Sequence, residues 1–177
     1  DETDRAVVEL VKSGLPVVCV DRSLAQVKTD LVEVDNYQGA FEAVSHLIGK
    51  GHATIGLIEG RSQVSTSRER RRGYLDALAA NGIAPRKDCM RAGDFKQESG
   101  RVLANELLDL RRPPTALFVC NNLMTVGALA AIHHRGLAVP RDVAVVGFDD
   151  LPWAEALDPP PTVVRQPAYE VGREAME

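Results

Sequence analysis

TALFVCNNLMTVGALAAIHHRGLAVPRDVAVVGFDD, residues 115–150, holds two short apolar runs with a longer apolar segment between them. The first run stops at Asn121 and the second at Asp149. The segment between them, Leu123–Arg135, is apolar on most sides and ends at Gly136, which predicts a buried helix with a glycine stop. A strand, a helix and a second strand at this spacing form a βαβ unit, so the stretch predicts an α/β fold with a parallel sheet.

The same alternation extends towards the N-terminus. Thr54–Ile58 and Cys89–Ala92 predict two further strands,. Three helices are expected between these strands and before them: one opened by Asp35 or Asn36 and ended at Gly49, one opened by Thr66 or Ser67 and ended at Gly82, and Gln97–Leu110,. The four strands of residues 54–148, with helices on both faces, are expected to form one complete lobe.

Residues 1–34 hold too little secondary structure for a lobe of their own. Their pattern predicts one helix, Thr3–Ser13, and two short strands, Val17–Val20 and Leu31–Val34,. One helix cannot cover both faces of a parallel sheet. This part therefore indicates an incomplete lobe, and the chain is expected to be a fragment whose missing parts precede Asp1 and follow Glu177.

The contrast between a complete and an incomplete lobe divides the chain into three expected segments. Residues 1–34 are expected to be a partial N-terminal lobe, and residues 35–163 a complete C-terminal lobe. Residues 164–177 are expected to cross over and to start a helix that returns to the N-terminal lobe. That helix should begin at Pro167 and run to the end of the chain, after a stiff connection at Pro159–Pro161,.

The composition is that of a globular domain. The chain has 177 residues, 45% of them hydrophobic, and a net charge of −4 from 21 Lys and Arg against 25 Asp and Glu. This balance argues against disorder and against a nucleic-acid-binding surface within the segment. No apolar run reaches the roughly 20 residues of a membrane span, and the charged first residues are not a secretory signal. Cys19, Cys89 and Cys120 form no CxxC pair, which favours a reducing compartment, the cytoplasm,.

Polar or aromatic side chains follow the predicted strands. The carboxyl ends of parallel strands share one edge of a sheet, and ligand-binding crevices form there. The sequence therefore predicts a small-molecule site assembled from scattered strand ends. Its candidate residues are Asp21, Arg70 (in the helix that follows Thr54–Ile58), Phe95, Asn121 and Asp149.

Each candidate has more than one interpretation. Asp149 and Asp150 could bind a ligand, share a magnesium ion with Asp21 in a phosphotransfer enzyme, or cap a helix over residues 152–157. Phe95 could stack on a sugar or a base, or belong to the core. Asn121 could contact a ligand or cap the following helix.

The arginine-rich sequence RERRR, which ends at Arg72, is a basic patch or the solvated face of a helix, with Arg72 paired to Asp76,. Helical phase places Arg70 and Arg71 beside the apolar stripe and points Arg72 away. One of the first two should therefore face inward, where it can grip a ligand or a carboxylate such as Asp149. Phase alone leaves Arg70 and Arg71 equally possible.

Motifs of catalysis or metal binding are not recognisable in this sequence. His46, His52, His133 and His134 lack the spacing of a metal site,. There is no GxGxxG, P-loop or GxSxG sequence,. We therefore expect no cofactor, no metal and no catalytic residue, and a protein that is not an enzyme.

The motifs taken together resemble the effector-binding core of the lac repressor/galactose repressor family of bacterial transcription regulators. They cover nearly the whole chain in the order GLPVVCVDR (14–22), VDNYQGA (34–40), HLIGKGH (46–52), RRRGY (70–74), PTALFVCN (114–121), VPRDVAVVGFDD (139–150) and TVVRQP (162–167). One departure stands at Asn121-Asn122, where many members have Asn-Asp.

The resemblance implies a two-lobed fold like that of periplasmic sugar-binding proteins, with an effector held between the lobes. The positions that match the family's effector contacts are Asp21, Thr66, Arg70, Phe95, Asn121 and Asp149. The family's arginine stands three residues before its Gly-Tyr pair, which selects Arg70 over Arg71. A sugar suits this set better than a purine, although Phe95 could stack on a purine.

The partners that the resemblance implies lie outside the chain. Family members bind operator DNA through an N-terminal helix-turn-helix domain, which this chain lacks. They form homodimers, and Thr125–Arg135 and Pro152–Leu157 match the positions at the dimer surface. Two other functions compete with a regulator: an exported sugar receptor of the same fold, and the magnesium-dependent enzyme.

Overall fold

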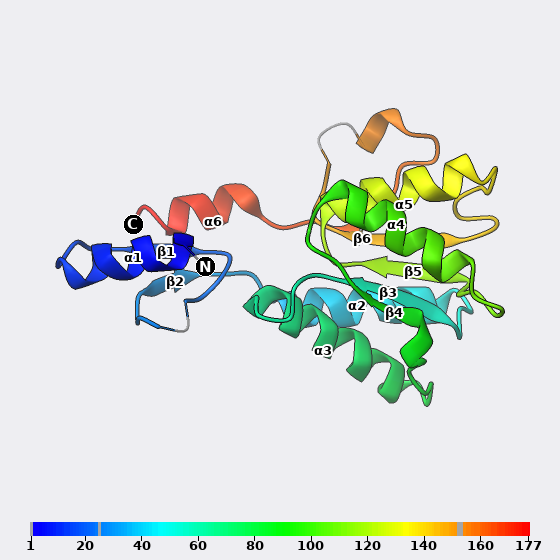
Figure 1. Ribbon diagram of the computed structural model, residues 1–177, viewed down its shortest axis with the longest axis horizontal. Helices are drawn as coiled ribbons and strands as arrows, with labels where there is room; N and C mark the ends of the chain where they lie inside the picture. Colours follow the sequence, from blue (N-terminus) through cyan, green and yellow to red (C-terminus); the bar gives the residue numbers. More distant parts are fainter. Residues whose placement is uncertain (1, 25, 152–153) are drawn as a thin grey trace. The chain divides into compact units, whose positions relative to one another are not determined.

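The computed structural model describes residues 2–24, 26–151 and 154–177 (Figure 1). The chain forms two compact units. Unit 1 comprises Asp1–Asp35 and Gln166–Glu177, and unit 2 comprises Asn36–Arg165. The chain therefore passes from unit 1 to unit 2 and back again, in two separate crossovers.

Unit 2 is built on a five-stranded parallel sheet. The strands are β3 (Ile55–Glu59), β4 (Met90–Ala92), β5 (Ala116–Val119), β6 (Ala144–Phe148) and β7 (Thr162–Val164), in the order β4-β3-β5-β6-β7. All pairings between neighbours are parallel, so the predicted α/β class is confirmed. Every residue of β5 and β6 is buried, as expected for strands with helices on both faces,.

Four helices cover this sheet in two layers. They are α2 (Asn36–Gly49), α3 (Ser65–Ala80), α4 (Gln97–Leu108) and α5 (Asn122–His134). The pair α2 and α3 packs together on one face of the sheet, and the pair α4 and α5 on the other (Figure 1). Short 3-10 turns lie at Lys87–Cys89 and Ala154–Ala156.

Glycines let the helices of each layer approach closely. A Cβ atom at Gly127 of α5 would lie 1.9 Å from the carbonyl oxygen of Gln97, and one at Gly100 of α4 would lie 2.2 Å from that of Met124. In the other layer, a Cβ at Gly73 would lie 2.4 Å from the carbonyl oxygen of Tyr37. Both helix layers therefore depend on residues without a side chain.

The four-strand prediction for unit 2 was incomplete. Thr162–Val164 pairs with Val146–Phe148 as the edge strand β7. It has three residues, is partly exposed, and follows three consecutive prolines, so its sequence does not resemble the buried strands,. The final helix is also shorter than predicted: α6 covers Ala168–Glu174 and ends before the last residue, Glu177.

Unit 1 contains α1 (Glu2–Lys12), β1 (Val18–Val20), β2 (Asp30–Val32) and α6. The two strands are parallel, and Val20 pairs with Val32 at their carboxyl ends. Several large apolar side chains of this unit are exposed: Leu10, Leu15, Val18, Val20, Tyr169 and Met176. A sheet of two strands with so few helices leaves its apolar faces uncovered. No helix in the described part of the chain is long and apolar enough to cross a bilayer.

Candidate functional site

Arg70 is the centre of a buried polar cluster at the carboxyl ends of β5 and β6. Its side chain leaves the first turns of α3 and is almost fully buried, with 3% of the residue exposed. Its Nε donates to Asn36 Oδ1 at 2.8 Å, and its Nη1 donates to the carbonyl oxygen of Cys120 at 2.6 Å. Nη1 lies 3.8 Å from Asp149 Oδ2, and the guanidinium lies 3.7 Å above the Phe148 ring. One arginine thus joins the start of α2 to the ends of two central strands.

The neighbouring arginines do not share this position. Arg71 is half-exposed, and its Nε lies 3.3 Å from Glu59 Oε2. Of the two candidates that helical phase left open, the inward one is therefore Arg70. Arg72 points outward as predicted, but its partner is Glu69, with Nη2 and Oε2 2.7 Å apart. The predicted pair with Asp76 was wrong because the i,i+3 neighbour took its place.

Asp149 and Asp21 follow their strands in the same unusual turn. Their φ angles are 73° and 71°, in the left-handed region that residues with a Cβ rarely adopt,. The Asp149 N–H donates to the carbonyl oxygen of Val164, the last residue of β7, at 2.9 Å. The Asp21 N–H makes the same bond to Val32, the last residue of β2, also at 2.9 Å. Each unit therefore holds one aspartate in a strained turn at a strand end, and such strain concentrates at binding sites.

Among the described residues, Phe95 is the third non-glycine residue with a left-handed backbone, at φ 69°. Its ring covers Gly60, where an added Cβ would lie 2.0 Å from the ring's Cζ. The side chain is partly buried and packs against the core. Phe95 therefore satisfies the core interpretation, and stacking of its ring on a ligand stays a prediction.

Asn121 caps α5, which confirms one of its two interpretations. Its Oδ1 accepts from the N–H of Met124 at 3.0 Å, and its Nδ2 donates to the carbonyl oxygen of Phe95, also at 3.0 Å. These bonds fix the loop that carries Phe95 to the end of β5. Contact of Asn121 with a ligand stays a prediction.

Thr66 lies in the first turn of α3 and is 5% exposed. It does not open the helix, and neither does Ser67, because α3 begins at Ser65 after Val64, which makes no side-chain cap. The hydroxyls of Ser65 and Ser67 are buried and have no hydrogen-bond partner among the described residues. The first turn of α3 therefore retains polar groups close in sequence to Arg70.

Asp150 differs from Asp149 in its partners. Its Oδ2 lies 2.6 Å from Arg165 Nη2, and its Oδ1 accepts from the N–H of Leu151 at 2.7 Å. The predicted cap of residues 152–157 cannot be followed, because 152–153 lie outside the described residues. No group of three or more His, Cys, Asp or Glu in the described ranges could hold a metal ion.

Two polar residues were not predicted from the sequence: Asn36, which belongs to this cluster, and Glu59, which pairs with Arg71. Asn36 was assigned only as a possible cap, yet it is 4% exposed and bonds Arg70. Glu59 ends β3, and a carboxylate within the apolar run TIGLIEG was a signal that could have identified it. Burial raises the pKa of Glu59, and the opposing attraction of Arg71 does not cancel this effect,.

Glu59→Gln should raise the free energy of unfolding at pH 7. Because the folded state raises the Glu59 pKa, the neutral carboxyl stabilises the fold below its usual pKa of 4.5, and this contribution is lost as the pH rises through the raised value,. The difference in free energy of unfolding between variant and parent, measured by urea denaturation, should therefore shrink below pH 4.5. Glu106→Gln, at an exposed carboxylate paired with Arg91, is the control. A Glu59→Gln variant less stable than the parent at pH 7 would mean that the Arg71 pair outweighs burial.

Cys120, whose carbonyl oxygen accepts from Arg70, is fully buried. Burial raises the pKa of its thiol to about 12. A thiol that stays protonated is a poor nucleophile, so Cys120 acts as a small core residue.

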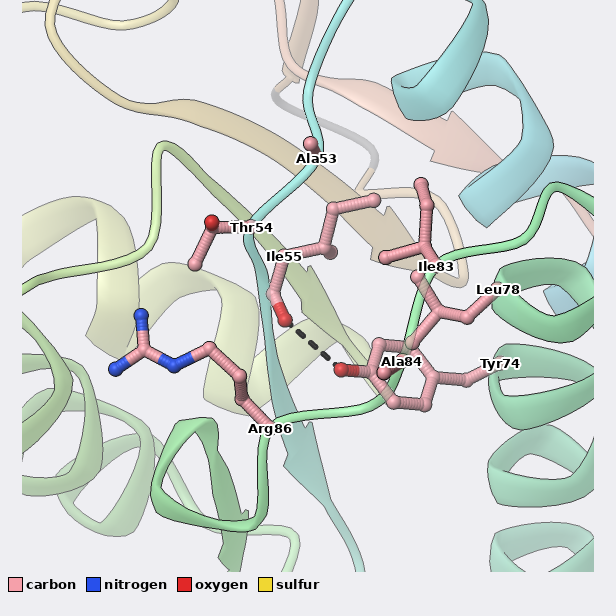
Figure 2. Close-up of a pocket in the computed structure, with 8 residues that line it drawn as sticks. All are labelled: Ala53, Thr54, Ile55, Tyr74, Leu78, Ile83, Ala84 and Arg86. Atoms are coloured by element: carbon pink, nitrogen blue, oxygen red, sulfur yellow. Dashed lines mark hydrogen bonds between the residues drawn. The ribbon is translucent and has the colours of Figure 1, made fainter.

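A small hollow lies at the amino end of β3, at the opposite edge of the sheet from Arg70 and Asp149. It is lined by residues that include Thr54, Ile55, Tyr74 and Arg86, and the Tyr74 hydroxyl donates to the carbonyl oxygen of Ile55 at 2.8 Å (Figure 2). Its volume of about 10 Å³ is close to the minimum that holds one water molecule,. Thr54 and Ile55 are at the amino end of the strand, whereas Arg70 and Asp149 are at carboxyl ends. This hollow is therefore separate from the candidate site.

The chain is similar to part of several longer known proteins. A family model described as a periplasmic binding protein-like domain matches residues 44–177. The HTH-type transcriptional repressor CytR of Escherichia coli (strain K12) is 37% identical over 171 residues, which are 97% of this chain and 50% of that protein. The chain thus spans about half the length of the curated relatives it matches.

Two solved structures show the likeness in three dimensions. A regulatory protein of the LacI family from Chloroflexus aggregans superposes with a TM-score of 0.87 at 35% identity, over 96% of this chain and 61% of that one. The transcriptional regulator CelR in complex with cellobiose superposes with a TM-score of 0.85 at 38% identity, over 94% of this chain and 51% of that one.

Proposed function

This chain belongs to the periplasmic binding protein-like domain family, in the form found in LacI-family regulators, and we propose that it is the effector-sensing core of a DNA-binding transcriptional regulator. Its effector-binding residues are Asp21, Thr66, Arg70, Phe95, Asn121 and Asp149. The named relatives are a transcriptional repressor and two regulatory proteins, which favours a regulator over an exported sugar receptor. The same names favour a sensor over an enzyme.

The observation that carries this proposal is the setting of Asp149. Its carboxylate is one-quarter exposed beside an almost fully buried arginine, on a backbone in the left-handed region. A fold keeps such a turn where it positions a functional group. The carboxylate can accept hydrogen bonds from a ligand while Arg70 holds it in place.

A sugar is the effector class that these groups favour. Carboxylates accept hydrogen bonds from vicinal hydroxyls, amides both accept and donate, and the partly buried Phe95 would offer an apolar face to a sugar ring,. The likeness to a regulator bound to cellobiose supports the same class. A purine base could also stack on the Phe95 ring, but it has fewer hydroxyl groups to donate hydrogen bonds to the carboxylates of Asp21 and Asp149.

The mechanism we propose is ligand-biased closure. An effector that binds one arrangement of the two lobes more tightly shifts the population towards it. This shift would change how a dimer presents its DNA-binding domains, with a coupling of about 1–3 kcal/mol. Operator DNA is contacted by a helix-turn-helix domain outside this chain, in a protein of the cytoplasm.

Homodimerisation would use α5, which holds most of the predicted segment Thr125–Arg135. Leu123, two residues before that segment on the same helix, is 48% exposed in spite of its apolar side chain. The second predicted segment, Pro152–Leu157, begins outside the described residues. Leu123→Glu should shift the intact protein to monomers in sedimentation experiments, whereas Val102→Glu, at a position of α4 that is 41% exposed, should leave dimers. Dimers that persist in both variants would contradict this assignment.

Effector binding tests the site. We expect isothermal titration of the intact protein against D-ribose, D-glucose, cellobiose, cytidine and hypoxanthine to find saturable binding of a sugar. Asp149→Asn should weaken that binding by at least about tenfold, because a charge-assisted hydrogen bond is lost.

The matched control is Asp142→Asn in the loop before β6, where the carboxylate pairs with the exposed Arg141. This change should leave the affinity within about twofold. Equal affinities for the parent and for Asp149→Asn would show that the site is elsewhere. Binding of hypoxanthine alone would replace the sugar assignment with a purine.

A further inference from the structure

The polar cluster of unit 2 reaches both crossovers between the two units. The chain enters unit 2 at Asn36 and leaves it at Arg165. We call Asp35–Asn36 the outgoing crossover and Arg165–Gln166 the return crossover. They are far apart in sequence, and both begin or end beside residues of the cluster.

Asn36 is the link to the outgoing crossover. It is the first residue of α2 and is 4% exposed. Its Oδ1 accepts from Arg70 Nε at 2.8 Å. A buried guanidinium N–H that lost this acceptor would stay without a strong partner, so the bond restrains both residues.

Asp149 is the link to the return crossover. Its N–H donates to the carbonyl oxygen of Val164, the residue immediately before Arg165, at 2.9 Å. The ion pair between Asp150 and Arg165 lies beside this bond, at 2.6 Å. Because the Arg165 side chain is 71% exposed, water and salt weaken that pair, and the backbone bond is the main connection,.

Arg70 and Asp149 close the connection between the two sides. Nη1 and Oδ2 are 3.8 Å apart, and the Phe148 ring supports the guanidinium from one face. The route therefore runs from Asn36 through Arg70 and Asp149 to Val164. Every step is a contact within unit 2, between residues 36 and 164.

We infer that Asn36 is a positioning residue that couples the effector site to both crossovers. It fixes the guanidinium of Arg70 beside Asp149, so that a ligand that displaces Asp149 alters the bonds at both crossovers together. This inference rests on the proposed function of Asp149 in effector binding. It extends that function by naming a residue that transmits binding without contacting the effector.

Hydrogen exchange in the intact protein tests the coupling without any effector. In Asn36→Ala, the N–H of Asp149 should exchange about tenfold faster, because the restraint on Arg70 is lost. The N–H groups of the interior strand β3 should keep their rates. Asn36→Asp should restore protection at Asp149, because a carboxylate oxygen also accepts from Arg70 Nε. Glu106→Gln, which alters an exposed ion pair, should change neither segment.

Two results would overturn the inference. In the first, Asn36→Ala would leave the exchange of Asp149 within about twofold of the parent. In the second, exchange would accelerate equally in β3 and at Asp149, which is the signature of a purely structural role. Because no effector takes part, failure here is distinct from failure of the titration that tests the proposed function.

Discussion

Arg70→Ala is expected to lower the free energy of unfolding by about 3 kcal/mol. The change removes two hydrogen bonds from a charged donor and the stacking on Phe148, and it leaves Asn36 Oδ1 without this donor. Breaking a buried ion pair by deleting one partner typically costs about 3–5 kcal/mol. The lower end of that range applies because Asp149 is one-quarter exposed, so water can reach its carboxylate.

Urea denaturation, monitored by circular dichroism, measures this change in the free energy of unfolding. Arg72→Ala is the matched control, because Arg72 lies two residues away on the same helix with its side chain 58% exposed. It should cost less than about 0.5 kcal/mol. Arg70→Lys keeps the charge but not the planar arrangement of donors, so its stability should fall between those of the parent and Arg70→Ala. Equal stabilities for the two alanine variants would contradict the account of the cluster.

Gly127→Ala is expected to cost about 3 kcal/mol or more, at a position between α4 and α5 that is not itself a proposed effector contact. The added methyl would lie 1.9 Å from the carbonyl oxygen of Gln97, and 2.6 Å from the backbone nitrogen of Arg101. Both obstacles are backbone atoms, so no rotation of a side chain can relieve the overlap. The helices α4 and α5 would have to separate, which would open the packing on that face of the sheet.

Gly49→Ala is the control for this prediction. Gly49 is the last residue of α2, and nothing lies within 4 Å of an added Cβ there. Alanine in a helix is favoured over glycine by up to about 1 kcal/mol, so this variant should be as stable as the parent or slightly more stable. A Gly127→Ala variant that unfolds at the same urea concentration as Gly49→Ala would show that α4 and α5 do not pack as described.

The sequence predicted the central strands well because their signal is local. Thr115–Cys120 and Val143–Phe148 are almost entirely apolar and are bounded by turns, and β5 and β6 lie within them, at Ala116–Val119 and Ala144–Phe148. The strand β7 was missed because it is formed by pairing with β6 rather than by its own pattern,. Thr162, Val163 and Val164 are β-branched and favour a strand, but three residues after three prolines are too short a run to be recognised,.

The candidate site was likewise predicted only where the signal was local. Strand ends indicated Asp149 and Asn121, since each directly follows an apolar run. Helical phase reduced the arginines to Arg70 and Arg71, but only the packing of α3 shows which one is buried. The bond to Asn36 joins residues 34 positions apart, so no local pattern could indicate it. Nor does an aspartate announce a left-handed backbone, as a glycine would,.

Affinity for DNA with and without a bound effector tests the central proposal most directly. The intact protein would first select fragments from its own genome, and their dissociation constants would then be measured with and without a saturating concentration of the sugar that binds most tightly. We expect the sugar to change the DNA affinity by about 5-fold to 150-fold, and Asn36→Ala to reduce that factor while the sugar still binds. Tight sugar binding that leaves the DNA affinity unchanged, or an intact protein that selects no DNA, would contradict the proposal that this chain is the sensing core of a transcriptional regulator.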